Sequence, residues 1–162
     1  MAVSTTPMQV LSGPDGTYLL GHHREVISGQ GATKTLQAKE SGALCLFDRA
    51  AGIVYTLPAP VLGMQFEFRV TTAITSNAAK VITNSASVFL VGSIMGGSLT
   101  VADSGDVFQG NGTTHVAVSM SGSTTGGLVG GSLIFTAISS TQWSVTGTYV
   151  GSSTLADPFA TS

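Results

Sequence analysis

Charged side chains are scarce in this chain. They make up 9% of its 162 residues, against about 25% in an average globular protein. All six Lys and Arg lie at or before Lys80, and beyond that point the only acidic residues are Asp103, Asp106 and Asp157. The chain has no long basic patch that could capture a nucleic acid backbone by electrostatics. We therefore expect no nucleic acid partner.

Low charge also bears on whether the surface of the protein is exposed to solvent or buried by a partner. The formal net charge is only −2, and Gly, Ser and Thr together exceed a third of the chain. Two interpretations are open: a hydroxyl-rich surface exposed in solution, or a surface buried by a partner or by other copies of the chain. We favour burial, because a protein with few charges tends to associate.

Cysteine occurs once, at Cys45. A single cysteine excludes an intramolecular disulfide and fits a reducing compartment. Because it lies between Leu44 and Leu46, we expect a buried core residue rather than a nucleophile.

Targeting signals are also missing from the sequence. The opening MAVSTTPMQV lacks the charged and apolar regions of a secretory signal, and no apolar run approaches 18 residues. We expect neither export by the secretory route nor a membrane-spanning segment.

Residues that could carry chemistry are few. Adjacent strand residues face opposite sides, so His22 and His23 could not chelate one ion there and are interpreted as surface or turn residues. Asp103 and Asp106 could share an ion, but calcium needs six to eight oxygen ligands, so a solvated turn is favoured. His115 begins an expected strand with no carboxylate beside it in sequence.

Catalytic signatures do not occur in the sequence either. It holds no G-x-S-x-G elbow, phosphate-binding loop, H-E-x-x-H or paired-cysteine zinc pattern. A triad assembled from distant residues stays open, but we do not expect an enzyme and assign no catalytic, cofactor-binding or metal residue. Core packing, rather than stacking on sugars, is expected of the remaining large aromatics, which are Tyr18, Tyr55, Trp143 and Tyr149.

What the chain does have is short apolar runs separated by turn residues. In Met64–Val70, Phe66, Phe68 and Val70 alternate with polar residues, the period expected of a strand with one buried face. The dipeptide Asn111–Gly112 predicts a tight hairpin that joins Val107 and Phe108 to the strand at 115–120. Further strands are expected at 17–20, 44–47, 53–57, 79–83, 88–91, 98–101, 133–138 and 142–150.

The connecting segments set the domain organisation. Gly and Pro punctuate residues 1–16, which we interpret as an extended N-terminal arm. Residues 17–150 form a single β domain, and residues 151–162 a C-terminal tail. Residues 34–40 are too short for a stable helix and could equally form a strand. Residues 121–131, SGSTTGGLVGG, are either a flexible loop or a place where another backbone comes close.

Many short strands without a credible helix predict an all-β fold. An antiparallel β-sandwich, a jelly roll and a small β-barrel, each with extended terminal arms, all fit this pattern.

Particular phrases of the sequence resemble a known family. They are SGALCLFDRAAGIVYTLPAP, GMQFEFRV, LIFTAISSTQWSVTG and GSSTLADPF, which together span much of residues 41–159. These phrases are similar to small virion proteins of tailed bacteriophages, above all to the head decoration, or cement, proteins. The family has no motif whose functional residues can be carried over to this chain.

The resemblance implies a structural virion protein. Its partners would be the major capsid protein and further copies of itself in a homotrimer, on the outer surface of a phage head assembled in the host cytoplasm. Terminal arms would grip neighbouring subunits, and many weak contacts together would give high avidity. A tail fibre or receptor-binding β-module of a phage virion is the alternative, and a small carbohydrate-binding or hydrolytic β-domain is a second rival.

Overall fold

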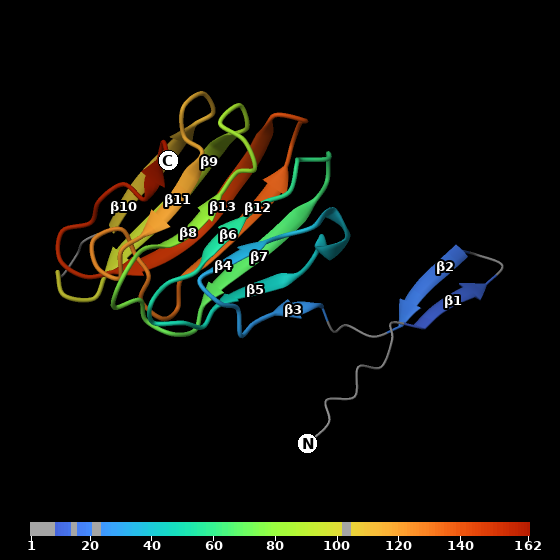
Figure 1. Cartoon of the computed structure of the whole chain (residues 1–162), viewed down its shortest axis with the longest axis horizontal. Coiled ribbons are helices and arrows are strands. Elements are labelled where there is room, and N and C mark those ends of the chain that lie inside the picture. Colours follow the sequence, from blue (N-terminus) through green and yellow to red (C-terminus); the bar gives the residue numbers. More distant parts are fainter. Residues whose placement is uncertain (1–8, 14–15, 21–23, 102–104) are drawn as a thin grey trace, which may run out of the picture.

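The regular structure of the chain is almost all β-strand, and two of its sheets pack together (Figure 1). This computed structural model describes residues 9–13, 16–20, 24–101 and 105–162. Within them the single helical element is the 3-10 turn η1 (Ala38–Glu40). The prediction of an all-β sandwich is confirmed.

The larger sheet has seven strands in the order β10-β9-β13-β12-β7-β5-β3. These strands are β3 (Val26–Ile27), β5 (Leu44–Phe47), β7 (Gln65–Val70), β9 (Phe89–Ser98), β10 (Gly105–Asn111), β12 (Ser132–Ala137) and β13 (Gln142–Gly151). The smaller sheet has the order β14-β11-β8-β6-β4. Its strands are β4 (Thr33–Thr35), β6 (Val54–Thr56), β8 (Ala79–Ile82), β11 (Ala117–Met120) and β14 (Phe159–Ala160).

Both sheets are mixed, so the expectation of purely antiparallel pairing was wrong. Parallel pairs join β5 to β3 and β7, β6 to β4 and β8, and β13 to β9. From β4 to β9, each strand lies in the other sheet from the strand before it. Because the chain reverses direction at each crossing, strands two apart in sequence run the same way. They become neighbours in every case from β3 to β8, whereas β7 and β9 are separated by β12 and β13.

Aromatic rings fill the space between the sheets. The alternation in β7 is confirmed, since Phe66, Phe68 and Val70 are buried. The Phe68 ring lies 5.3 Å from the ring of Phe135 on β12 and 5.3 Å from that of Tyr55 on β6, in the opposite sheet. Edge-on contacts of this kind add to the stabilisation from area burial alone.

Two local strand predictions failed at turns. The Asn111–Gly112 turn exists, with Gly112 at a φ of 70°, but β10 pairs with β9 and β11 belongs to the other sheet. The dipeptide therefore carries the chain between sheets instead of closing a hairpin. The strand expected at 98–101 is absent because β9 ends at Ser98, whose Oγ accepts hydrogen bonds from the backbone N–H groups of Thr100 and Val101.

The glycine-rich segment 121–131 is a site of close backbone approach. Gly122 has a φ of 82°, and a Cβ built there would lie 2.0 Å from the carbonyl oxygen of Ile74. The second of the two interpretations of this segment is thus the one that the packing supports.

The chain termini behave differently from each other. Strands β1 (Gln9–Gly13) and β2 (Gly16–Leu20) pair antiparallel in a two-stranded sheet of their own, so the segment interpreted as an extended arm contains a strand. At the other end, β14 pairs with β11, and Leu155 and Phe159 are buried. Residues 151–162 are therefore part of the sandwich and not an extended arm.

Candidate functional site: the outer face and edge of the large sheet

The outer face of the seven-stranded sheet is rich in hydroxyl side chains. Strand alternation turns Val145 and Tyr149 of β13 into the core, whereas Thr146 and Thr148 are exposed on the other side. Across the strands, Thr146 lies opposite Ser93 of β9 on one side and Ile134 of β12 on the other. The result is a continuous row of uncharged side chains, two hydroxyl and one apolar, across three strands.

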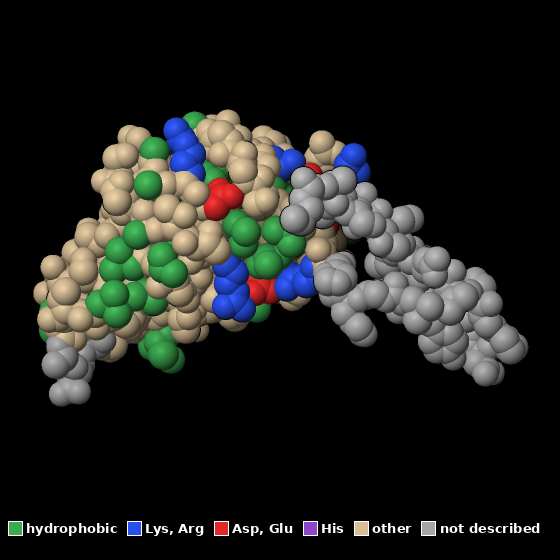
Figure 2. All heavy atoms as spheres, turned by 90° about the horizontal axis from the view of Figure 1, so that it is seen from below, with side chains coloured by type: hydrophobic (Ala, Val, Ile, Leu, Met, Phe, Trp, Pro, Cys, Tyr) green, Lys and Arg blue, Asp and Glu red, His purple; other side chains and the backbone are tan. Residues whose placement is uncertain are grey.

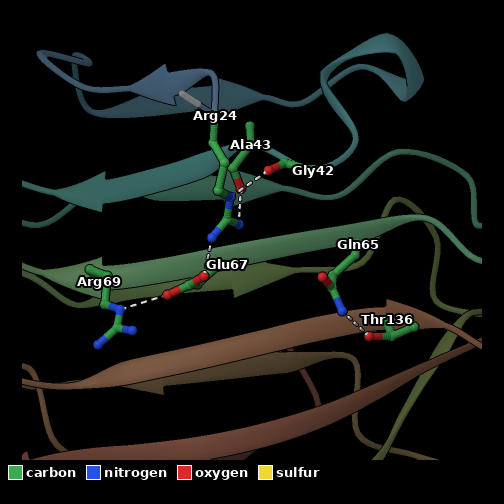
Figure 3. A network of polar contacts seen from close by, with 7 residues as sticks. All are labelled: Arg24, Gly42, Ala43, Gln65, Glu67, Arg69 and Thr136. Carbon is green, nitrogen blue, oxygen red and sulfur yellow. Dashed lines mark hydrogen bonds and ion pairs between the residues drawn. The ribbon is translucent and has the colours of Figure 1, made fainter. Parts of the chain in front are cut away.

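A network of charged side chains lies beside this face, at its β3 end (Figure 3). Glu67 of β7 accepts hydrogen bonds from the Arg24 guanidinium and, at 2.7 Å, from Arg69 Nε. Arg24 Nε also donates to the carbonyl oxygen of Gly42 at 2.9 Å. The hydrogen bond from Arg24, with a smaller one from Arg69, outweighs desolvation and lowers the pKa of Glu67. A separate hydrogen bond lies nearby, in which Gln65 Nε2 donates to Thr136 Oγ1 of β12 at 3.2 Å.

A second ion pair lies near η1. Lys34 Nζ lies 2.8 Å from Glu40 Oε1, and the backbone N–H of Gln37 donates to Glu40 Oε2 at 2.6 Å. Burial disfavours the charged form of Glu40, but these two hydrogen bonds outweigh it and lower the pKa of that carboxyl. Together with the Arg24–Glu67–Arg69 network, this pair places opposite charges in contact on the β3 and β4 side of the sandwich.

The other half of the large sheet carries almost no charge. Strands β9, β12 and β13 have no Lys, Arg, His, Asp or Glu, and β10 has only Asp106. In Figure 2, which shows one face, the left end of the described surface is tan and green, and the blue and red side chains lie over the rest, around a green patch. Two apolar side chains stand out on this half: Met95 of β9 and Val107 of β10 lie directly opposite each other, and each is 57% exposed.

Strand β10 is the edge of the large sheet and is seven residues long. β9 pairs with one side of β10, and no strand of the sheet pairs with its other side. The backbone N–H of Gly112 donates to the Leu90 carbonyl oxygen of β9, whereas that of Asn111 donates to His115 Nδ1. Because alternate residues of a strand bond to the same neighbour, the residues of β10 that bond to β9 are Gly110 and every second residue before it. Val107 and Gln109 are in the opposite phase, and their N–H and C=O groups point away from β9. Within the described part of the chain, neither makes a backbone hydrogen bond across that free edge.

Cys45 and the large aromatics with described side chains are core residues, as predicted. Cys45 is buried, and burial raises the pKa of its thiol to about 12. Tyr55 and Tyr149 are also buried, and their hydroxyls donate to the carbonyl oxygens of Leu46 and Ala156. Burial raises the pKa of both phenols, that of Tyr149 to about 12. Trp143 is fully buried beside Phe66, and its Nε1 has no hydrogen-bond partner within the described structure.

His115 joins elements of the sandwich. Its ring stacks on Phe159 of β14 with centroids 5.5 Å apart, and its carbonyl oxygen accepts a hydrogen bond from the Leu90 N–H of β9. Asp106 is exposed on β10. His22, His23 and Asp103 lie outside the described residues, as does the side chain of Tyr18.

Sequence reasoning missed the Arg24–Glu67–Arg69 network and the open edge. The alternation in β7 already placed Glu67 and Arg69 on the face opposite Phe66 and Phe68. Arg24, however, comes from 43 residues away in the chain, which no local pattern indicates.

The described residues form neither a metal centre nor a membrane-spanning helix. Among the described residues, no group of three or more His, Cys, Asp and Glu side chains could hold a metal ion. In the same part of the chain, no helix has the length and apolar character needed to cross a membrane.

Comparison with known proteins gives no relative. No family model, no curated protein and no solved structure matches this chain.

Proposed function

We propose that this chain is a structural virion protein that decorates a tailed-phage head by binding the outer surface of the major capsid protein lattice. One observation carries the proposal: the broad outer face of the large sheet is built from hydroxyl and apolar side chains and has almost no charge over β9, β12 and β13. Such a face can be buried against protein without the desolvation of ionised groups, which is the costly part of protein association.

The arrangement of the charges supports the same function. Glu67 and Glu40 are each bonded to cations of their own chain, so these two carboxylates are already satisfied before any partner binds. The resemblance of residues 41–159 to decoration proteins points to a capsid as the partner. Copies of the chain itself would be the second partner, in a homotrimer.

The positions of the aromatic rings support decoration over receptor binding. A receptor-binding module would present aromatic side chains on exterior loops. Here the rings of Phe47, Tyr55, Phe135 and Trp143 pack inside the sandwich.

The test is co-sedimentation of the purified chain with DNA-free heads of the phage that encodes it. We expect saturable binding of the native chain. Thr146→Lys should weaken it at least tenfold, since a partner would have to bury an unpaired ammonium group on the outer face. Asn84→Lys is the matched control, because it makes the same charge change at an exposed residue in the loop between β8 and β9.

Two results would contradict the proposal. One is that the native chain does not sediment with heads, or labels the tail in immunogold micrographs; tail labelling would favour the receptor-binding alternative. The other is equal binding by Thr146→Lys and the native chain.

A further inference from the structure

The edge strand β10 is an unprotected template for another strand. Edge strands in soluble proteins are usually short or carry Lys or Pro, which discourage pairing with other chains. β10 has seven residues, GDVFQGN, with neither Lys nor Pro. The backbone groups of Val107 and Gln109 point to its free side, and the apolar pair Val107 and Met95 is exposed beside it.

The other edges of the sandwich offer much less. β3 and β14 have two residues each and β4 has three. Near its end, β10 is closed off at Asn111, whose N–H is in phase with those of Val107 and Gln109 and is bonded to His115 Nδ1. The open stretch is therefore Gly105–Gln109, five residues long.

The same chain contains a strand pair that needs a partner. β1 and β2 form a two-stranded sheet that is hydrogen-bonded to no strand of the sandwich. An isolated two-stranded hairpin is at best marginally stable in water, so further strands or a packing surface are needed to hold it. Each of its strands has five residues, the length of the open stretch, and neither contains a charged residue.

Chain connectivity decides which copy of the hairpin can pair with β10. The hairpin ends at Leu20 and β3 begins at Val26, so five residues join it to the β3 edge of the large sheet. The six Cα–Cα steps from Leu20 to Val26 span at most about 22 Å when fully extended. β10 is at the opposite edge, six strand spacings away, which is about 29 Å. The linker is therefore too short for the hairpin to pair with β10 of its own chain.

We propose that the β1–β2 hairpin of one copy adds to the β10 edge of a second copy and extends its seven-stranded sheet. The contact joins unlike surfaces of the two copies, so repetition around a rotation axis closes a ring and leaves no free β10 edge. The inference rests on the part of the proposed function in which the chain assembles with itself, and it requires no capsid.

Pairing of two β10 strands with each other is the competing arrangement. Antiparallel pairing of β10 with its own copy around Val107 would place the two Asp106 side chains diagonally across from each other, about 7–8 Å apart, where their like charges repel. It would also leave both hairpins without a partner. The uncharged hairpin avoids both problems.

The first experiment removes one donor from the free edge. In Val107→Pro, the lost N–H is one that points away from β9, so the bonds between β9 and β10 remain. Val107→Thr keeps the N–H and is the matched control. Size would be measured by light scattering after gel filtration across a range of concentrations, with the melting temperature as the check on folding.

We expect the native chain and Val107→Thr to form closed oligomers. In Val107→Pro the concentration for half-assembly should rise at least about tenfold, because the lost bond recurs at each contact of the ring. A native chain that is monomeric at every concentration, or a folded Val107→Pro variant that assembles as well as the native chain, would overturn the inference.

The second experiment identifies the occupant of the edge and does not depend on the proline variant folding. Ser12→Cys and Gln109→Cys chains would be treated with a short bismaleimide, separately and mixed; Cys45 is buried and serves as the internal control. We expect covalent dimers of unlike chains in the mixture and few in either variant alone. Dimers in Gln109→Cys alone would show β10 pairing with β10 and overturn the proposal.

The two proposals fail separately. Hairpin exchange without binding to heads would contradict the decoration function and leave the assembly intact. Binding to heads by a chain that stays monomeric would do the reverse.

Discussion

At the residue scale, burial and not reactivity governs the groups that could carry chemistry. Cys45 and Tyr55 lie in the core, and desolvation raises the pKa of each. Glu67 is the opposite case, since two guanidinium groups hold it in its charged form. The position of Cys45 between two leucines was enough to predict its burial. The partner of Glu67 was not predictable, because Arg24 is distant in sequence.

Cys45 should be inert in the folded protein. With a thiol pKa of about 12 and no exposed surface, it should react with Ellman's reagent at pH 8 only after unfolding, since the thiolate is the reactive form. The measurement is the rate of thiol labelling with and without denaturant. Labelling of the native protein as fast as that of the unfolded chain would contradict the burial of this residue.

Glu67 should contribute stability that is lost in acid. Its pKa is lowered in the folded state, so below the pKa of the unfolded chain, near 4.5, the unfolded state binds more protons and stability falls as the pH decreases. Both arginines are well exposed, so the contribution is at most about 1 kcal/mol.

Glu67→Gln tests this contribution. The variant should be slightly less stable than the native protein at pH 7, and this difference should shrink between pH 5 and pH 3. Urea unfolding at a series of pH values measures it, with Thr148→Glu as a control that adds an unpaired carboxylate at an exposed residue of the same sheet. A difference that is the same at pH 7 and pH 3 would rule out the ion pair as its source.

At the element scale, strand existence was predictable and strand partners were not. The period-two patterns of β7, β12 and β13 follow directly from a face that must be buried, and these strands lie where they were expected. The predicted hairpin between β10 and β11 was wrong, because a turn dipeptide specifies a reversal of the chain and does not determine which sheet the next strand joins. Parallel pairing, such as that of β9 with β13, joins residues about fifty positions apart and leaves no local signal.

The last strand should stabilise the sandwich. Phe159 of β14 is 7% exposed and stacks on His115, so Phe159→Ala should lower the free energy of unfolding by about 3 kcal/mol, as for other truncations of buried aromatics. Thr161→Ala, at an exposed residue two positions later, is the control and should change stability by less than about 0.5 kcal/mol. Equal stability of both variants would mean that residues 151–162 form a free tail after all.

At the scale of the whole molecule, the two ends of the large sheet differ in charge. The β3 end carries most of the ionised side chains, among them the paired Glu67 and Glu40. The β10 end carries hydroxyl and apolar side chains, with Asp106 as its one acidic residue, and an open strand edge. Composition alone predicted a protein that associates, but only the fold shows that the uncharged residues share one half of one sheet. We therefore propose that this half of the large sheet is the surface that binds protein.

An electron cryomicroscopy map of intact particles of the phage that encodes the chain tests this account most directly. We expect density for the β-sandwich on the outer surface of the head, in groups of three, with the low-charge half of the large sheet against neighbouring protein. Density at the tail, or heads without this density, would contradict the account.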